Sequence, residues 1–337
     1  MKAIRKEGGV RRKRNRKPIR AGNSKAAPPL QIETILVPID FSRACLQAVP
    51  WAKFLKRATK CAVHLVHVHG YEYPLPADMV PPAVASSAET KKRLQRHLKK
   101  FAISHGLSGA AAQCHIRTGN AADQICKVAR AINADLVVSS THGHTGWKQV
   151  FLGSTAERLA RHASCPVLIA RQPASGRVRA PSLKKIVVPL DFSRASTTGL
   201  DFAIRLARPF RAALTLLHVV NQEQYLTPEG AVMYAGPNVA ERAVAIAKER
   251  MQALVDATDL HGVKYTTAVP SFRGGTFEDA ICAYSANRSM DLIVSTTHGR
   301  TGLRHTLLGS VAEHIVRYAK GPVLVVPTAR TRIIVKK

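Results

Sequence analysis

The sequence predicts two tandem α/β domains, each with a parallel β-sheet that is covered by helices on both faces. The chain has 337 residues, which is enough for two domains that each bury a sizeable core. Part of it occurs twice, because LVPIDFSRA at 36–44 returns as VVPLDFSRA at 187–195. Within each copy, short apolar runs rich in β-branched residues alternate with helical segments, and this alternation is typical of a parallel sheet.

The duplication extends over nearly the whole chain. ADLVVSSTHG at 134–143 matches MDLIVSTTHG at 290–299, and CPVLIA at 165–170 matches GPVLVV at 321–326. The offset between the copies grows from 151 to 156, so the second copy carries about five extra residues. The predicted divisions are a basic tail at 1–31, a first domain at 32–171, a linker at 172–183, a second domain at 184–329 and a basic C-terminal tail at 330–337.

Strands and helices can be assigned in order along the first copy. The expected strands are TILVPI (34–39), AVHLVHVH (62–69), AAQCHIR (111–117), DLVVSS (135–140) and PVLIA (166–170). The expected helices are at 42–58, around 89–105, at 120–132 and at 154–163. Pro50 should distort or interrupt the first helix, because proline cannot donate a backbone hydrogen bond. Asn120 and Asp123 have the spacing of a capping box at the start of the third helix.

Charge is the most unusual property of the composition. The formal net charge is +30, and Arg11–Lys17 reads RRKRNRK. The composition of this segment favours a solvated, disordered extension. Nonspecific binding to nucleic acid or to an anionic membrane surface is the alternative, and a cleaved transit peptide is a further one.

The spacing of the cysteines and the lack of long apolar segments bear on the cellular compartment and on membrane association. The six cysteines occur singly, and Cys126 and Cys282 occupy equivalent places in the two copies, so we expect reduced thiols rather than disulfides. No run of about 18 apolar residues is present, and no apolar segment of a secretory signal follows the basic start. A cytoplasmic protein without a transmembrane segment is therefore expected.

A glycine-rich loop is also kept in both copies. STHGHTGWKQVFLGS at 140–154 and TTHGRTGLRHTLLGS at 296–310 are identical at eight positions. Neither segment is a Walker A loop, because no Gly-Lys-Ser/Thr follows the glycines, and neither is the Gly-x-Gly-x-x-Gly of a dinucleotide fold. In each copy this loop follows the fourth strand and leads into a helix.

Together these segments resemble the universal stress protein family in its tandem two-domain form. The matching motifs are PIDFS and PLDFS, LVHV and LLHV, the glycine loop and the closing Pro-Val strand, and they cover nearly everything after residue 32. The resemblance implies two tandem five-stranded parallel sheets of order 3-2-1-4-5. That order makes strands one and four neighbours at a topological switch point, where open α/β sheets bind ligands. The loop then looks like a phosphate cradle at a helix N-terminus. Ser154 and Ser310 would cap that helix or donate to a phosphate oxygen.

In the nucleotide-binding branch of the family the loop is Gly-x-x-Gly, nine residues, then Gly-Ser/Thr. Here the spacing from Gly143 to Gly153 is intact, but the first glycine is Ser140, and Thr296 replaces it in the second copy. A side chain now stands where the family brings bare backbone beside the nucleotide. This substitution either narrows the pocket or supplies a hydroxyl group to the ligand.

The resemblance implies an ATP site in each copy, with magnesium held only through the nucleotide. The aspartates would face ribose and phosphates, the valines would offer backbone groups to adenine, and the prolines would shape the floor. The implied site residues are Pro38, Asp40, Val68, Ser140, His142, Gly143, Gly146, Gly153, Ser154 and Thr155 in the first copy, and Pro189, Asp191, Val219, Thr296, His298, Gly299, Gly302, Gly309, Ser310 and Val311 in the second.

Structural readings of the same residues stay open. Asp40 and Asp191 could instead cap the following helix, and the valines and prolines could be ordinary strand-end residues. His142 and His298 are better explained as loop braces than as catalytic bases, because the motif supplies no nucleophile or orienting acid. The alternation in HLVHVH puts His64 on the opposite face from the other two histidines, which disfavours a metal site.

Three functions remain after this reading. The first is an adenine-nucleotide-binding regulator of the stress response without strong catalysis, in which ATP shifts conformation or partner affinity. The alternative is a partner scaffold or dimerisation protein that binds no nucleotide. A slow ATPase is the minor alternative, since there is no Walker lysine. In the family the fifth strands of two domains pack together, which implies pairing of the two domains within this chain and leaves further self-association open.

Overall fold

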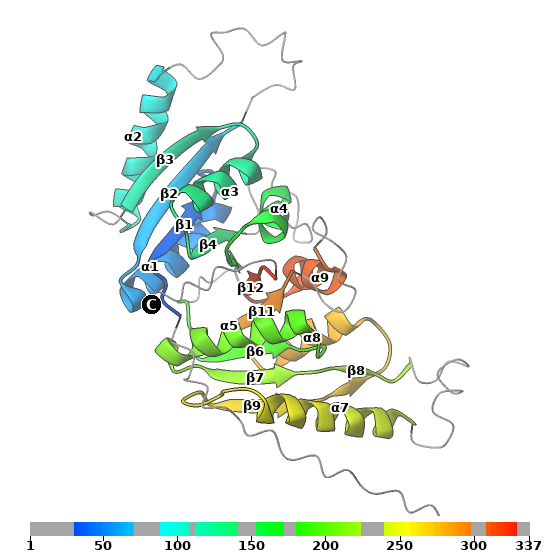
Figure 1. Ribbon diagram of the computed structural model, residues 1–337. Coiled ribbons are helices and arrows are strands. Elements are labelled where there is room, and N and C mark those ends of the chain that lie inside the picture. The colour runs from blue at the N-terminus through cyan, green and yellow to red at the C-terminus, as the bar shows by residue number, and fades with distance from the viewer. Residues whose placement is uncertain are drawn as a thin grey trace, which may run out of the picture.

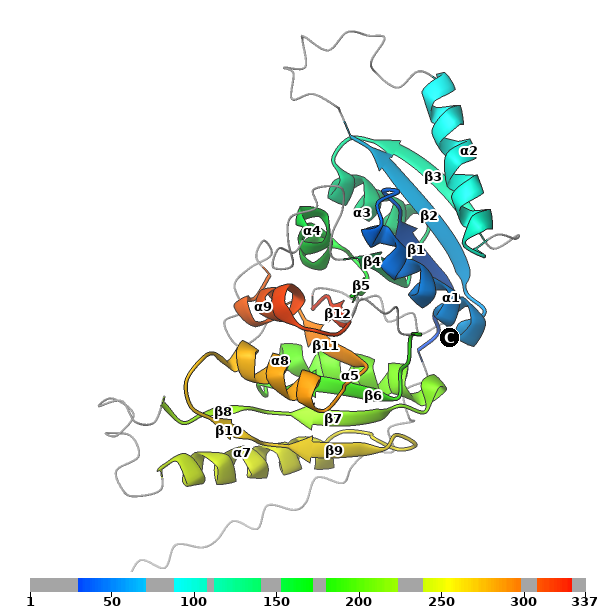
Figure 2. The same cartoon turned by 180° about the vertical axis from the view of Figure 1, so that it is seen from behind.

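The computed structural model describes residues 30–70, 88–107, 112–140, 153–171, 180–223, 239–297 and 308–328. It consists of two similar halves that lie side by side and share one sheet, with the outermost strands at opposite ends of the molecule (Figures 1 and 2). None of the helices within these ranges has the length and apolar character needed to cross a bilayer.

The elements of the first half follow the expected alternation. They are β1 (Thr34–Pro38), the 3-10 helix η1 (Ala44–Gln47), α1 (Ala48–Thr59), β2 (Ala62–His69), α2 (Ala88–Ser104), β3 (Ala112–Thr118), α3 (Ala121–Ala131), β4 (Leu136–Ser140), α4 (Ser154–His162) and β5 (Val167–Ala170).

The second half repeats this order and adds two short strands. Its elements are β6 (Lys185–Pro189), α5 (Arg194–Phe210), β7 (Ala213–Leu217), β8 (Val220–Asn221), α7 (Val239–Asp256), β9 (Tyr265–Ala268), β10 (Ser271–Phe272), α8 (Phe277–Asn287), β11 (Leu292–Thr296), α9 (Ser310–Tyr318) and β12 (Val323–Val326).

The sheet differs from the expected pair of separate five-stranded sheets. Its order is β3-β2-β1-β4-β5-β12-β11-β6-β7-β9, so each half has the order 3-2-1-4-5 but the two form one ten-stranded sheet. Strands within a half are parallel, whereas β5 and β12 pair antiparallel with Leu168 opposite Leu324. Both strands are apolar and buried throughout, and pairing satisfies the backbone groups of edges that would otherwise be bare.

Helices contact each other across this junction on both faces of the sheet. On the face covered by α1, α2, α5 and α7, the rings of Phe54 and Phe210 stack with centroids 5.4 Å apart. On the opposite face, Arg317 of α9 donates to Glu157 of α4 at 3.4 Å. Each of the two main apolar clusters contains residues of both halves, so the core is continuous through the junction.

Local sequence explains where the helices begin. The expected helix at 42–58 is divided just before Pro50, into η1 and α1, so the predicted distortion is confirmed. Pro50 lies in the first turn of α1, where its missing N–H breaks no hydrogen bond of that helix. Asn120 caps α3 by accepting from the Asp123 N–H at 3.2 Å. In the second half Thr276 and Asp279 form both bonds of a capping box at α8.

Candidate functional site

The first part of the site is a tight turn after the first strand of each half. The Asp40 carboxylate accepts from the backbone N–H of Ser42 at 2.9 Å and from its hydroxyl at 2.7 Å. Asp191 accepts from the Ser193 N–H at 2.9 Å in the same way. Neither aspartate caps the next helix, because Arg43 and Ser193 occupy the N-cap positions of η1 and α5. The carboxylates therefore brace the turn, and the capping alternative is wrong.

The residue between the aspartate and the serine is held in an unusual conformation. Phe41 and Phe192 have φ values of +63° and +61°, a region that favours glycine. Their rings lie against His67 and His218, with centroids 4.7 and 4.5 Å apart. Such backbone strain persists only where surrounding contacts enforce it, and it is common near ligand sites.

The histidine of the second strand fixes the turn from the other side. Nδ1 of His67 bonds to the carbonyl oxygen of Ile39 at 2.8 Å, and Nδ1 of His218 bonds to that of Leu190 at 2.7 Å. Burial lowers the pKa of His67, which favours the neutral ring, so we assign Nδ1–H as the donor to Ile39. The sequence motif Leu/Val-His-Val thus holds the Asp-Phe-Ser turn in place.

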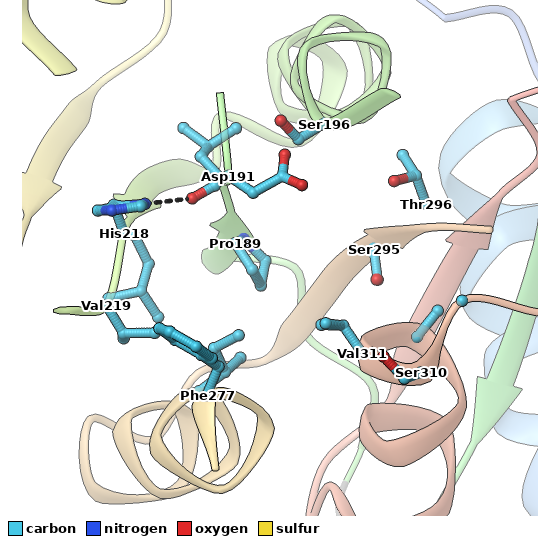
Figure 3. A pocket seen from close by; sticks show the side chains of 15 residues that line it. Pro189, Asp191, Ser196, His218, Val219, Phe277, Ser295, Thr296, Ser310 and Val311 are labelled. Atoms are coloured by element: carbon cyan, nitrogen blue, oxygen red, sulfur yellow. Dashed lines mark hydrogen bonds between the residues drawn. The ribbon is translucent and has the colours of Figure 1, made fainter. Parts of the chain in front are cut away.

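In the second half these turns border a cavity of about 250 Å³ (Figure 3). It lies at the carboxyl ends of β6, β7 and β11 and beside the first turns of α8 and α9. The cavity is lined by Pro189, Leu190, Asp191, Ser196, Leu217, His218, Val219, Phe277, Ile281, Ser295, Thr296, Gly309, Ser310, Val311 and Ala312.

The lining has two chemically different parts. Val219 and Phe277 lie together on one side, and Asp191, Ser196 and Thr296 lie on another (Figure 3). The first part is apolar and includes an aromatic ring. The second carries a carboxylate and hydroxyl groups, so an amphipathic ligand would enter in only one orientation.

The start of α9 forms a further wall. Gly309 is the N-cap, and Ser310, Val311 and Ala312 of the first helical turn line the cavity. Backbone N–H groups in a first turn have no partner within their helix, and the helix dipole there favours an anion. Ser310 and its counterpart Ser154 are the first helical residues, not the caps. That part of the prediction is wrong, because the preceding glycines take the cap position in extended backbone.

The predicted residues of the second copy that the structure describes all line the cavity: Pro189, Asp191, Val219, Thr296, Gly309, Ser310 and Val311. Six of their counterparts occupy the same positions relative to β1, β4 and α4: Pro38, Asp40, Ser140, Gly153, Ser154 and Thr155. The seventh, Val68, lies within β2, whereas Val219 follows the end of β7. His142, Gly143, Gly146, His298, Gly299 and Gly302 lie outside the described residues.

Sequence reasoning missed several lining residues, and Phe277 is the most informative. Its place in the first copy is taken by Ala121, and the place of Ser196 is taken by Cys45. Of the five extra residues of the second copy, three lie between β9 and α8. There Phe272 of β10 contacts Phe277 edge-on, with ring centroids 5.7 Å apart. Aligning the two copies position by position would have exposed this difference.

Thr296, which replaces the first glycine of the family loop, lines the cavity and packs against α5. A Cβ added to Gly199 would lie 2.7 Å from the Thr296 methyl group, so that methyl group occupies the space left by the glycine. In the first copy the equivalent positions hold Ser140, which lacks the methyl group, and Ala48, which supplies a Cβ. One methyl group therefore fills the space in each copy, but it belongs to the strand residue in the second copy and to the helix residue in the first.

The histidines of the second strand do not assemble a metal site. Nδ1 of His64 lies 3.0 Å from Nε2 of His115, while His67 turns to Ile39. In the part of the chain that the structure describes, no group of three or more His, Cys, Asp or Glu side chains is placed to hold a metal ion.

Cysteine chemistry at the sites is suppressed by burial. Burial, and then the charge of Asp40, raises the pKa of Cys45 to about 12. Burial likewise raises the pKa of Cys165 to about 12 and that of Cys282 to about 11. Only the thiolate is nucleophilic, so these thiols are inert at neutral pH.

We expect Cys45, Cys165 and Cys282 to be alkylated slowly by iodoacetamide in the native protein. At a pKa of about 12, only about one thiol in 10⁵ is ionised at neutral pH. Peptide mass spectrometry after short labelling, with the urea-unfolded chain as control, measures each site. Native labelling of Cys45 as fast as in urea would contradict the burial argument.

Comparison with known proteins agrees with the fold and the duplicated motifs. The model of the universal stress protein family matches residues 31–171 and 182–327. A universal stress protein of Mycobacterium tuberculosis is 27% identical over 299 residues, covering 86% of this chain and 95% of the relative. One of Methanocaldococcus jannaschii is 33% identical over 145 residues, covering 42% of this chain and 81% of the relative.

A solved structure shows the same fold at low sequence identity. The universal stress protein of Archaeoglobus fulgidus superposes with a TM-score of 0.60 at 18% identity, covering 88% of this chain and 99% of that one. Both halves contribute to the family match, so the chain belongs to the universal stress protein family and carries two copies of the family's domain.

Proposed function

We propose that the second half binds an adenine nucleotide, with ATP as the expected ligand, and that the protein acts as a nucleotide-responsive regulator rather than as a catalyst. The observation that carries this proposal is the cavity between β6, β11, α8 and α9. It joins an aromatic wall, a row of hydroxyl groups and a helix N-terminus within about 250 Å³. A base, a ribose and a phosphate require these three environments in this combination.

The base would lie against Phe277 and Val219. Stacking of a base on an aromatic side chain contributes about 1–3 kcal/mol, and Phe277 is braced by Phe272. Ala121 offers no such surface in the first half. The proposal therefore assigns tighter binding to the second half.

The phosphates would lie at the start of α9. Ser310, Val311 and Ala312 of the first turn line the cavity, and the helix dipole there favours an anion. Asp191 is a hard oxygen donor that lines the cavity, which fits a magnesium ion carried by the nucleotide. When bound, that ion would neutralise phosphate charge.

A regulatory rather than catalytic role fits the titratable groups of the lining. Among the lining residues that the structure describes, Asp191 and His218 are the only titratable side chains, and each already holds the Asp-Phe-Ser turn. A general base must be free to take a proton from the attacking water. We therefore propose that hydrolysis is at most slow and that binding itself is the signal.

Calorimetric titration with Mg-ATP, to about 1 mM, tests the proposal. Phe277→Ala should weaken ATP binding about tenfold, because about 1.4 kcal/mol of stacking is lost. Tyr284→Ala is the matched control, since it removes a ring from the same helix outside the cavity. Absence of binding heat, together with absence of nucleotide released from the denatured protein, would reject the site and favour the scaffold alternative.

A further inference from the structure

The solvent face of α2 carries a dense row of positive charge. Its sequence AETKKRLQRHLKKFAIS has six Lys/Arg residues and one acidic residue. All six basic side chains are exposed. We call Lys92, Arg93, Arg96, Lys99 and Lys100 the α2 stripe, because their helical spacing places them on the side opposite the buried residues.

The opposite side of α2 is fixed on the sheet. Leu98 is fully buried, and Phe101 and Ala102 are 9% and 3% exposed within the core that covers β2 and β3. The helix lies at the outer end of the molecule next to β3 in both views (Figures 1 and 2). The α2 stripe is therefore a rigid, outward-facing surface on an ordered element.

Glu89, one turn before Lys92 and Arg93, is the single acidic residue of α2 and offsets little of this charge. The Nζ atom of Lys53 lies near Gly106, just beyond the end of α2. Within the described residues, no ion pair joins the α2 stripe to a carboxylate. Exposed cations that are not paired with carboxylates can neutralise phosphates of a nucleic acid. The counterions condensed on that nucleic acid are then released, and their gain in entropy favours binding.

The second half supplies an internal comparison. Its equivalent helix is α7, which also follows the second strand and covers the outer edge of the sheet. That helix holds three basic and three acidic residues and is balanced in charge. The positive face is thus not a requirement of the fold, since the same element in the same chain forms without it.

We propose that the α2 stripe binds the phosphate backbone of double-stranded nucleic acid. The stripe spans nine residues, about 12 Å of helix axis at 1.5 Å per residue. Duplex DNA presents about seven phosphate charges over that length, which matches a row of five cations. A membrane surface fits less well. Helices that lie on bilayers insert a broad apolar face, whereas the apolar face of α2 is packed on the sheet and Ile103 is the only exposed large apolar residue within Ala88–Ser104.

The test uses the full chain, so that the basic tail is present in every sample. The stripe variant carries Lys92→Gln, Arg96→Gln and Lys99→Gln. Its control carries Arg242→Gln, Lys248→Gln and Arg250→Gln on α7, which are also exposed. Both variants lose three charges, so their net charge is the same. Fluorescence anisotropy of a labelled duplex of about 20 base pairs gives the affinity from about 50 to about 300 mM NaCl.

We expect the stripe variant to bind at least about tenfold more weakly at about 100 mM NaCl. Its slope of log affinity against log salt should be shallower by about 2.7, at about 0.9 for each lost phosphate contact. The α7 control should keep the slope of the parent. Equal losses in the two variants would assign binding to net charge or to the tail and overturn the proposal. Stripe-dependent binding to phosphatidylserine vesicles, with none to the duplex, would overturn it as well.

Discussion

Leu168→Asp should destabilise the entire chain by about 4 kcal/mol or more. Leu168 is 3% exposed and lies at the centre of β5, between Val138 of β4 and Leu324 of β12. An aspartate there would lose the apolar contacts and bury a carboxylate without a cation. Because the core runs through the junction, we expect both halves to lose stability together.

Urea unfolding monitored by circular dichroism and by gel filtration measures this effect. Leu46→Asp is the control, because Leu46 is 37% exposed and the charge remains in water. If the aspartate variant does not fold, Leu168→Ala provides the measurement, with an expected loss of about 2–5 kcal/mol. An unchanged unfolding midpoint in both Leu168 variants would show that β5 and β12 do not hold the halves together.

Gly199→Ala should lower the free energy of unfolding when residue 296 is threonine and raise it when residue 296 is serine. In the parent chain the new Cβ would meet the Thr296 methyl group at 2.7 Å, and overpacking of this kind costs about 1–3 kcal/mol. In the Thr296→Ser background the obstruction is gone. Alanine should then stabilise α5 by about 0.5–1 kcal/mol, since glycine is a poor helix former.

A double-mutant cycle of the four proteins gives the coupling between the two positions. The first half provides the matched control. Ala48→Gly should cost about 0.5–1 kcal/mol with Ser140 unchanged, because no methyl group there needs the space. Equal effects of Gly199→Ala in both backgrounds would mean that Thr296 turns away at no cost, and the packing argument would then fail.

Because the domain sequence is duplicated, most of the fold could be predicted from the sequence. LVPIDFSRA and VVPLDFSRA mark the same strand twice, and the alternation of strands and helices was confirmed in both halves. The order 3-2-1-4-5 came from the family resemblance and holds within each half. Periodicity could not reveal that β5 and β12 join into one sheet, because strand pairing over such a distance is a tertiary property.

The cavity-lining residues that belong to sequence motifs could be predicted. Those that reach the cavity only through tertiary packing could not. Asp191 and Ser310 belong to motifs, and both line the cavity. Phe277 lies in no motif and lines the cavity from the first turn of α8, which packs beside α9. Ser310 was predicted to cap α9 or to donate to a phosphate oxygen. The first role is wrong because Gly309 takes the cap position, and the second stays a prediction. The glycine loops themselves remain predictions, as they lie outside the described residues.

The junction between β5 and β12 also determines how this molecule can change. In a homodimer of identical subunits, one gene encodes both sides, so every substitution appears twice and must be tolerated in both places. Here the two sides are separate stretches of one polypeptide, and a substitution appears once. One half can therefore gain an aromatic wall at Phe277 while the other gains a cationic helix at α2. The two halves of a single chain can therefore acquire different binding surfaces.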